Sequence, residues 1–102
     1  MLRLLRRRQA PTGSGAPSYK AARHVVAARQ GDRTILLDAR RGRYFGVDDV
    51  GATIWKQLGE GATLSKLVAV LESEYAAPRE TLELDAAAFI TRLERAHLVV
   101  VE

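Results

Sequence analysis

A change of pattern from strands to a helix occupies residues 34–58, which read TILLDARRGRYFGVDDVGATIWKQL. The short apolar run Thr34–Leu37 stops at an aspartate, and residues 38–42 have the composition of a turn, in which Gly42 suits a positive φ. Residues 43–47 then resume an extended pattern. An earlier extended segment ends at a tight turn near Gly31-Asp32, so the sequence predicts an antiparallel meander of three strands between residues 23 and 47.

The spacing of apolar residues becomes helical after residue 47, in three successive segments. The first can be capped by Asp48 or Asp49 and ends at two nearby glycines. The second begins after Thr63 and stops at Pro78, because proline cannot continue a helix. The third is expected to begin at Asp85 and to end near residue 97, and residues 98–101 close the chain as a short extended piece. The expected fold is therefore α+β, a three-stranded antiparallel sheet followed by three helices.

Length and charge divide the chain into a tail and one domain. The 102 residues are enough for a single small domain, and 47% of them are hydrophobic, as in ordinary globular proteins. The formal net charge of +4 is uneven, since residues 1–20 carry five basic residues and no acid. Residues 1–20 are therefore expected to be a disordered basic tail, and residues 21–102 the folded domain. The arginine cluster is not followed by the apolar stretch of a signal peptide, and no run could cross a bilayer, so a cytoplasmic protein without membrane contact is expected.

Catalytic and metal chemistry finds no support in the sequence. The chain has no cysteine, which excludes a disulfide scaffold, a cysteine nucleophile and a cysteine-based metal site. Its two histidines, His24 and His97, lie on different expected elements, and no serine sits in a nucleophile elbow. No glycine-rich phosphate loop is present either. We therefore expect a binding module with no catalytic residue, no metal and no cofactor.

The residues from position 34 onward resemble the PqqD-like family, whose members are recognition elements for ribosomally synthesised and post-translationally modified peptides (RiPPs). The positions that carry the resemblance are Leu36-Leu37-Asp38, Gly42, Tyr44-Phe45, Val47-Asp48, Gly51, Ile54-Trp55, Leu58, Gly61, Leu67-Val68, Tyr75, Asp85, Phe89-Ile90, Leu93 and Leu98-Val99. They span about residues 24 to 101, so residues 21–102 are interpreted as a PqqD-like leader-peptide-binding domain. A stand-alone chain with these motifs is most similar to the lasso-peptide leader-binding subunit, and its segment between the second and third strands departs from PqqD itself.

The resemblance implies a winged helix-turn-helix-like fold and a way of binding. The leader segment of a precursor peptide would add a strand beside residues 43–47 and enter a cleft walled by the third helix. The expected peptide-binding residues are Arg43, Tyr44, Phe45, Gly46, Val47, Phe89, Arg92, Leu93 and Ala96. Arg43, Arg92 and Arg95 could pair with acidic leader residues at the rim. Alternation along a strand puts Tyr44 and Phe45 on opposite faces, and the sequence does not decide which of them faces the cleft.

The implied partners are the precursor leader peptide, a leader peptidase on a separate chain and a macrolactam-forming cyclase. A homodimer through the exposed edge strand is left open. The main alternative is a winged-helix DNA-binding regulator, since the fold alone permits it. A DNA reader needs a basic recognition helix, whereas residues 85–97 balance Arg92 and Arg95 against Asp85 and Glu94. We therefore favour peptide recognition and expect no nucleic-acid partner. A small regulatory subunit without a peptide ligand is a third reading.

Overall fold

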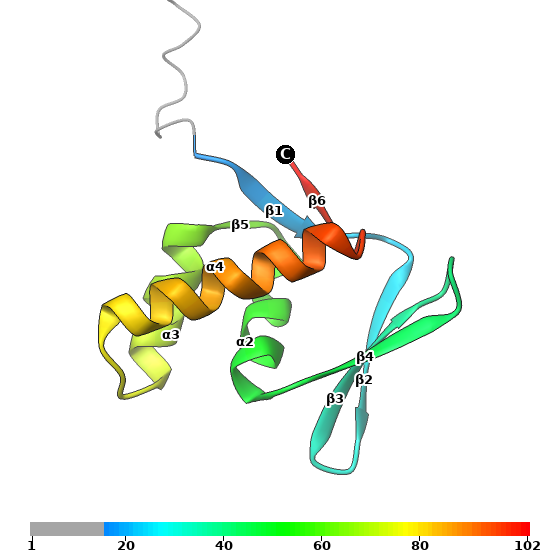
Figure 1. The fold of residues 1–102 in the computed structure, drawn as a ribbon, viewed down its shortest axis with the longest axis horizontal. Helices are drawn as coiled ribbons and strands as arrows, with labels where there is room; N and C mark the ends of the chain where they lie inside the picture. The colour runs from blue at the N-terminus through cyan, green and yellow to red at the C-terminus, as the bar shows by residue number, and fades with distance from the viewer. Residues whose placement is uncertain (1–15) are drawn as a thin grey trace, which may run out of the picture.

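The computed structural model describes residues 16–102 of the chain. These residues form three helices and two small antiparallel sheets, with strand orders β2-β3-β4 and β5-β1-β6 (Figure 1). In chain order the elements are β1 (Ser18–Ala21), β2 (Val25–Gln30), β3 (Arg33–Asp38), β4 (Arg43–Val47), α2 (Asp49–Leu58), β5 (Ala62–Thr63), α3 (Leu64–Glu74), α4 (Arg79–Arg95) and β6 (Val99–Val101). The expected α+β fold, with an antiparallel meander followed by three helices, is confirmed.

The meander β2-β3-β4 projects from the helical part of the molecule (Figure 1). The tight turn between β2 and β3 begins at Gly31, and the turn between β3 and β4 ends at Gly42. Both glycines have a φ of 66°, because these turns need a backbone conformation that other residues rarely adopt. Side chains alternate between the two faces of β3, so that Leu36 is buried toward the helices while Leu37 is exposed on the outer face. The meander therefore has one face against the core and one face toward solvent.

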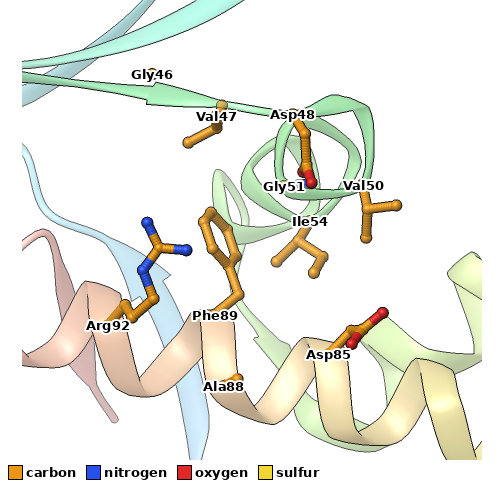
Figure 2. A pocket seen from close by; sticks show the side chains of 10 residues that line it. All are labelled: Gly46, Val47, Asp48, Val50, Gly51, Ile54, Asp85, Ala88, Phe89 and Arg92. Atoms are coloured by element: carbon orange, nitrogen blue, oxygen red, sulfur yellow. The ribbon is translucent and has the colours of Figure 1, made fainter.

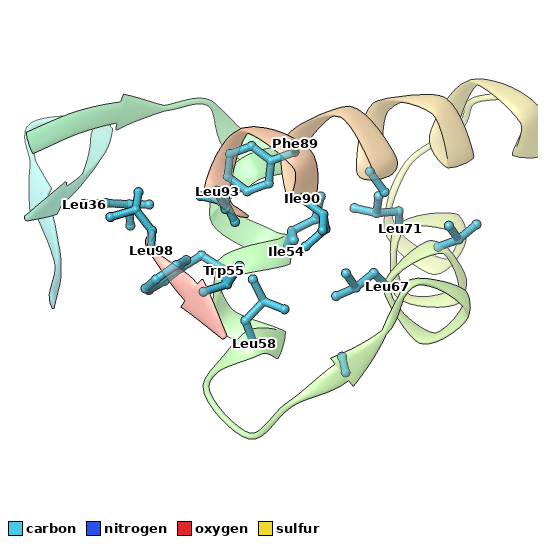
Figure 3. Close-up of a cluster of buried hydrophobic side chains, with 14 of the residues drawn as sticks. Leu36, Ile54, Trp55, Leu58, Leu67, Leu71, Phe89, Ile90, Leu93 and Leu98 are labelled. Carbon is cyan, nitrogen blue, oxygen red and sulfur yellow. The ribbon is translucent and has the colours of Figure 1, made fainter. Parts of the chain in front are cut away.

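The core lies between the three helices and the inner face of the meander (Figure 3). The carboxylate of Asp48 caps α2 by accepting the N–H of Gly51 at 2.8 Å, and the hydroxyl of Thr63 caps α3 by accepting the N–H of Lys66 at 3.2 Å. The sequence predicted the cap at Thr63 and left the cap of α2 open between Asp48 and Asp49; the structure has Asp48. The largest side chains that are fully buried are Leu36, Ile54, Leu58, Leu67, Leu71 and Leu98. Each contributes about 1.5–3 kcal/mol to folding by leaving water.

The start of α4 differs from the prediction. The helix begins at Arg79, directly after Pro78, and Asp85 is an exposed residue inside it rather than its cap. The apolar stripe extends one turn further back, to the buried Leu82, and the fixed φ of proline suits the residue before a first turn. The helix ends at Arg95. His97, two residues later, has a left-handed φ of 61°, and the N–H of Leu98 bonds to the Leu93 carbonyl at 2.9 Å.

The sheet β5-β1-β6 brings distant parts of the sequence together. Tyr19 of β1 pairs with Val101 of β6 on one side and with Ala62 of β5 on the other. The expected extended piece at residues 98–101 is thus confirmed in β6. The expected boundary between tail and domain is wrong, because β1 begins at Ser18 and residues 18–20 belong to the folded unit. Residues 1–15 of the expected tail lie outside the described residues. Among residues 16–102 no helix is long and apolar enough to cross a membrane.

Candidate functional site

A cleft runs between the edge strand β4 and the helix α4. It consists of two hollows of about 490 and 360 Å³, which share Val47, Phe89 and Arg92 in their linings. The first hollow extends toward the start of α2, where Figure 2 shows Phe89 rising from α4 toward Val47 and Ile54. The second extends toward the end of α4 and is lined by Phe45, Leu93 and neighbouring residues. The cleft thus follows the whole length of β4.

The floor of the cleft depends on a close approach of Phe89 to α2. A Cβ added at Gly51 would lie 3.2 Å from the Cζ atom of Phe89 and 3.2 Å from the Cβ of Val47. Glycine at position 51 therefore leaves the space into which the ring fits. The guanidinium carbon of Arg92, one turn further along α4, lies 5.9 Å from the centre of the Phe89 ring. Phe89 is 9% exposed, so its ring is largely core and presents only part of its surface to the cleft.

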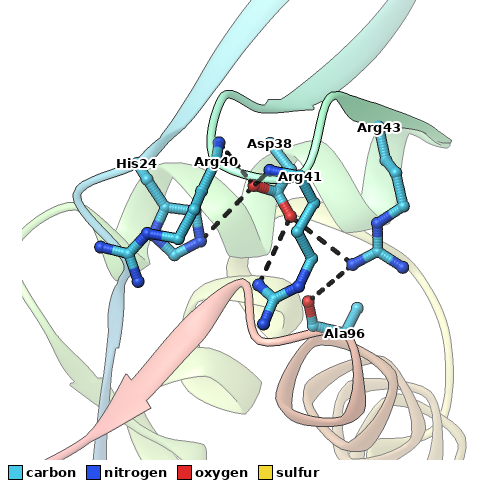
Figure 4. Close-up of polar contacts among 6 residues, drawn as sticks. All are labelled: His24, Asp38, Arg40, Arg41, Arg43 and Ala96. Carbon is cyan, nitrogen blue, oxygen red and sulfur yellow. Dashed lines mark hydrogen bonds and ion pairs between the residues drawn. The ribbon is translucent and has the colours of Figure 1, made fainter.

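Arg43 connects the two walls of the cleft at its other end (Figure 4). Its Nη2 atom donates to the main-chain carbonyl of Ala96 at 3.2 Å and lies 3.5 Å from Oδ2 of Asp38. Its guanidinium carbon lies 5.2 Å from the centre of the Phe45 ring. The side chain of Arg43 is thereby held across the mouth of the cleft, with about half of it exposed.

The carboxylate of Asp38 holds this arrangement together. It accepts the backbone N–H groups of Arg40 and Arg41 at 3.0 Å each, and the Nε2 atom of His24 lies 3.6 Å from its Oδ1 (Figure 4). Burial of the carboxyl opposes its ionisation. The two backbone N–H groups, His24 and Arg43 outweigh that effect and hold the pKa of Asp38 below its ordinary value. Asp38 is therefore a carboxylate at neutral pH and fixes the turn that leads into β4.

The charges around the cleft differ between its two ends. The hollow near the end of α4 is lined by Arg43, Arg92 and Arg95 and by no acidic residue. The hollow near the start of α2 is lined by Asp48 and Asp85 in addition to Arg92. Within residues 16–102, Arg92 and Arg95 make no ion pair with an acidic side chain. The cleft is therefore positively charged near the end of α4 and of mixed charge near the start of α2.

The structure brings together most of the residues expected from the sequence. The lining of the cleft includes Arg43, Phe45, Gly46, Val47, Phe89, Arg92, Leu93 and Ala96. Tyr44 is the exception, because its side chain is 71% exposed on the outer face of the meander, where it is paired with Leu37. Phe45 is therefore the aromatic residue of β4 that faces the cleft, and only the main chain of Tyr44 lies at the edge.

The prediction missed several lining residues. They are Leu36, Asp48, Val50, Gly51, Ile54, Asp85, Ala88 and Leu98. Asp85 and Ala88 lie one helical turn before Phe89 and Arg92, so the helical spacing would have found them had Asp85 not been taken for a cap. No group of three or more potential metal-ligating side chains occurs in the described part of the chain.

Comparison with known proteins identifies the family. The model of coenzyme PQQ synthesis protein D (PqqD) matches residues 33–99. One similar solved structure is TbiB1 in complex with the TbiA(beta) leader peptide, with 36% identity, a TM-score of 0.71 and coverage of 78% of this chain and 93% of that one. Another is lasso peptide synthetase B1 complexed with the leader peptide, with 28% identity, a TM-score of 0.71 and coverage of 80% and 96%. No curated protein matches significantly. The chain belongs to the PqqD-like family of RiPP recognition elements.

Proposed function

We propose that this protein binds the leader segment of a ribosomally made precursor peptide, of the lasso class, as a fourth strand on β4. The observation that carries the proposal is the position of β4. It is an outer strand of its sheet, with no neighbour on one side among residues 16–102, and a partly apolar cleft lies beside it. An edge strand of this kind offers free N–H and C=O groups to an incoming strand. The likeness to two solved leader-peptide complexes supports the same function.

The geometry of the meander indicates which backbone groups of β4 would bind the peptide. Gln30 and Arg33 flank a turn of two residues, and residues in that position form a hydrogen-bonded pair. Hydrogen-bonded and non-hydrogen-bonded pairs alternate along antiparallel strands. Counting along the register to β4, we expect Tyr44 and Gly46 to direct their N–H and C=O groups away from β3. Those groups would bond to the leader strand.

The side chains of the cleft would select the peptide. Every second residue of a fourth strand points to the inner face, where Phe45, Phe89 and Leu93 offer apolar contacts. Arg43, Arg92 and Arg95 would attract an acidic leader residue at the end of α4. Main-chain bonds then provide most of the affinity and these side chains provide the selection.

The protein would act by delivering its ligand to other chains. No Cys nucleophile exists in the sequence, and the described residues offer no cluster of metal ligands. We therefore assign it no reaction of its own and propose that a separate leader peptidase and an ATP-dependent macrolactam-forming cyclase act on the presented peptide. DNA binding is not supported, because the three arginines of α4 are outnumbered by its four acidic residues.

Fluorescence anisotropy with a labelled TbiA(beta) leader peptide tests the proposal. We expect saturable one-to-one binding that weakens only modestly between 50 and ~500 mM salt, because main-chain bonds dominate. A peptide of the same composition in scrambled order and a random DNA duplex serve as controls. Binding of the duplex with a steep salt dependence, or equal binding of the scrambled peptide, would contradict the proposal.

A further inference from the structure

The side chain of Arg33 lies across Gly46 on the outer face of the meander. A Cβ built at Gly46 would be 2.8 Å from Nη2 of Arg33 and 3.7 Å from its guanidinium carbon. Gly46 pairs with Ile35, so Arg33 reaches it diagonally from two residues earlier in β3. The guanidinium therefore occupies the space that a side chain at position 46 would otherwise fill, and it does so on the free edge of the sheet.

The guanidinium of Arg33 has no acidic partner within residues 16–102. The other residues of β2, β3 and β4 whose side chains share the outer face near it are uncharged. They are Val26, Ala28, Gln30, Ile35, Leu37 and Tyr44. A cation held among uncharged side chains at an open edge is suited to a carboxylate brought by another strand. Arginine fits this task because its planar group forms two parallel bonds to a carboxylate.

A fourth strand on β4 would place one of its residues opposite Gly46. Directly opposed residues of neighbouring strands point to the same face, with their Cβ positions about 4.5–5.5 Å apart. The side chain of that peptide residue would therefore project over Gly46, next to the guanidinium of Arg33. This residue faces away from the cleft, so the arginines of α4 cannot reach it.

We propose that Arg33 is a specificity-determining residue that binds an Asp or Glu of the leader peptide at the position opposite Gly46. The inference rests on the proposed function, since it needs a peptide strand at β4. It adds a second face to recognition. Leader residues that point inward would be selected by the cleft. The one residue that points outward, opposite Gly46, would be selected by Arg33.

A scan of charge along the peptide tests this assignment. In the TbiA(beta) leader peptide each position in turn is made Glu in one peptide and Gln in another, and both affinities are measured. For wild-type protein we expect one position at which the Glu peptide binds about three- to tenfold more tightly than the Gln peptide, as is usual for an exposed charge-assisted bond. Arg33→Ala should abolish this preference for Glu. Arg33→Lys should retain only part of the preference. Gly46→Ala should reduce it, because the new methyl group displaces the guanidinium.

Arg29→Ala is the matched control, because it removes one arginine from β2, at the far side of the meander from β4. It should leave the preference for Glu at that position intact. The inference is overturned if the peptide binds but no position prefers Glu, or if the preference persists in Arg33→Ala. If the parent peptide does not bind to the wild-type protein at all, the proposed function itself has failed. The two failures are thus distinguishable.

Discussion

The guanidinium of Arg43 donates a hydrogen bond to the main-chain carbonyl of Ala96 at 3.2 Å, and this contact joins the edge strand to the C-terminal end of α4. The accepting carbonyl belongs to the last turn of the helix, where carbonyl groups lack partners within the helix and the helix dipole favours a cation. One side chain, which also forms an ion pair with Asp38, therefore links the two walls of the cleft at this end.

Arg43→Ala should weaken binding of the leader peptide about tenfold, because it removes both the contact between the walls and one cation of the cleft. Arg41→Ala is the comparison, since Arg41 also lies near Asp38, at 3.9 Å, but within residues 16–102 its side chain makes no hydrogen bond or ion pair with α4. We expect it to change affinity less than threefold. Equal losses in the two variants, measured by anisotropy, would show that the contact with Ala96 has no role in binding.

Arg92→Glu should weaken binding of a leader peptide that carries acidic residues, by about tenfold or more, because it reverses a charge in the middle of the cleft. The melting temperature should stay within a few degrees of wild type, since an exposed charge usually contributes little to stability. The assignment of the cleft is wrong if affinity is unchanged while the same peptide still binds.

Gly46→Pro should abolish leader binding, because proline removes the N–H that we expect to face the peptide strand. An edge strand tolerates proline better than a central one, so the domain should remain folded by circular dichroism. Gly46→Ala keeps the N–H and should retain measurable binding. Full binding by the proline variant would place the peptide elsewhere on the surface.

Asp38 should make stability depend on pH in the acid range. Its folded-state pKa is below the ordinary value of about 3.9, so the contribution of its ionised form is present above that value and is lost as the pH falls further. Asp38→Asn should be less stable than wild type at pH 7, and the difference should shrink toward pH 2 in urea titrations. A difference that is constant over this range would exclude the ionised form as the stabilising species.

His97→Gly should raise the free energy of unfolding by about 0.5–1 kcal/mol, because His97 adopts the left-handed conformation that glycine adopts without strain. Ala96→Gly, one residue earlier at a φ of −89°, gains no such relief and should be neutral or destabilising. Thermal unfolding of both variants measures the contrast. No gain in His97→Gly would mean that its side chain contributes contacts that offset the strain.

The parts of this fold that the sequence predicted are those with local signals. The turns at Gly31 and Gly42 and the cap at Asp48 are visible within a few residues, and the structure contains all three. β1 has no such signal, because its partners Val101 and Ala62 lie far away in the sequence. Its pairing is a tertiary effect, which short-range patterns do not encode.

The same limit applies to the cleft. The residues on β4 and on the later turns of α4 were found from the resemblance, whereas Gly51 and Ile54 line the cleft only because α2 packs beneath Phe89. Arg33 was missed because its neighbour Gly46 is brought close by the pairing of strands and not by sequence distance. Alternation alone could separate Tyr44 from Phe45, but only the packed core shows that Phe45 is the inward residue.

The pairing of β1 with β6 places the two ends of the folded unit next to each other, with the N–H of Glu102 bonded to the Ser18 carbonyl at 2.7 Å. Domains whose ends meet can be inserted into a surface loop of a host protein, or circularly permuted, with little strain. This small sheet is separate from the meander that holds β4 (Figure 1). A host enzyme could therefore be joined to the domain through the paired strands β1 and β6 while the edge of β4 stays open. The domain could then serve as an inserted peptide-binding unit in engineered peptide-modifying enzymes.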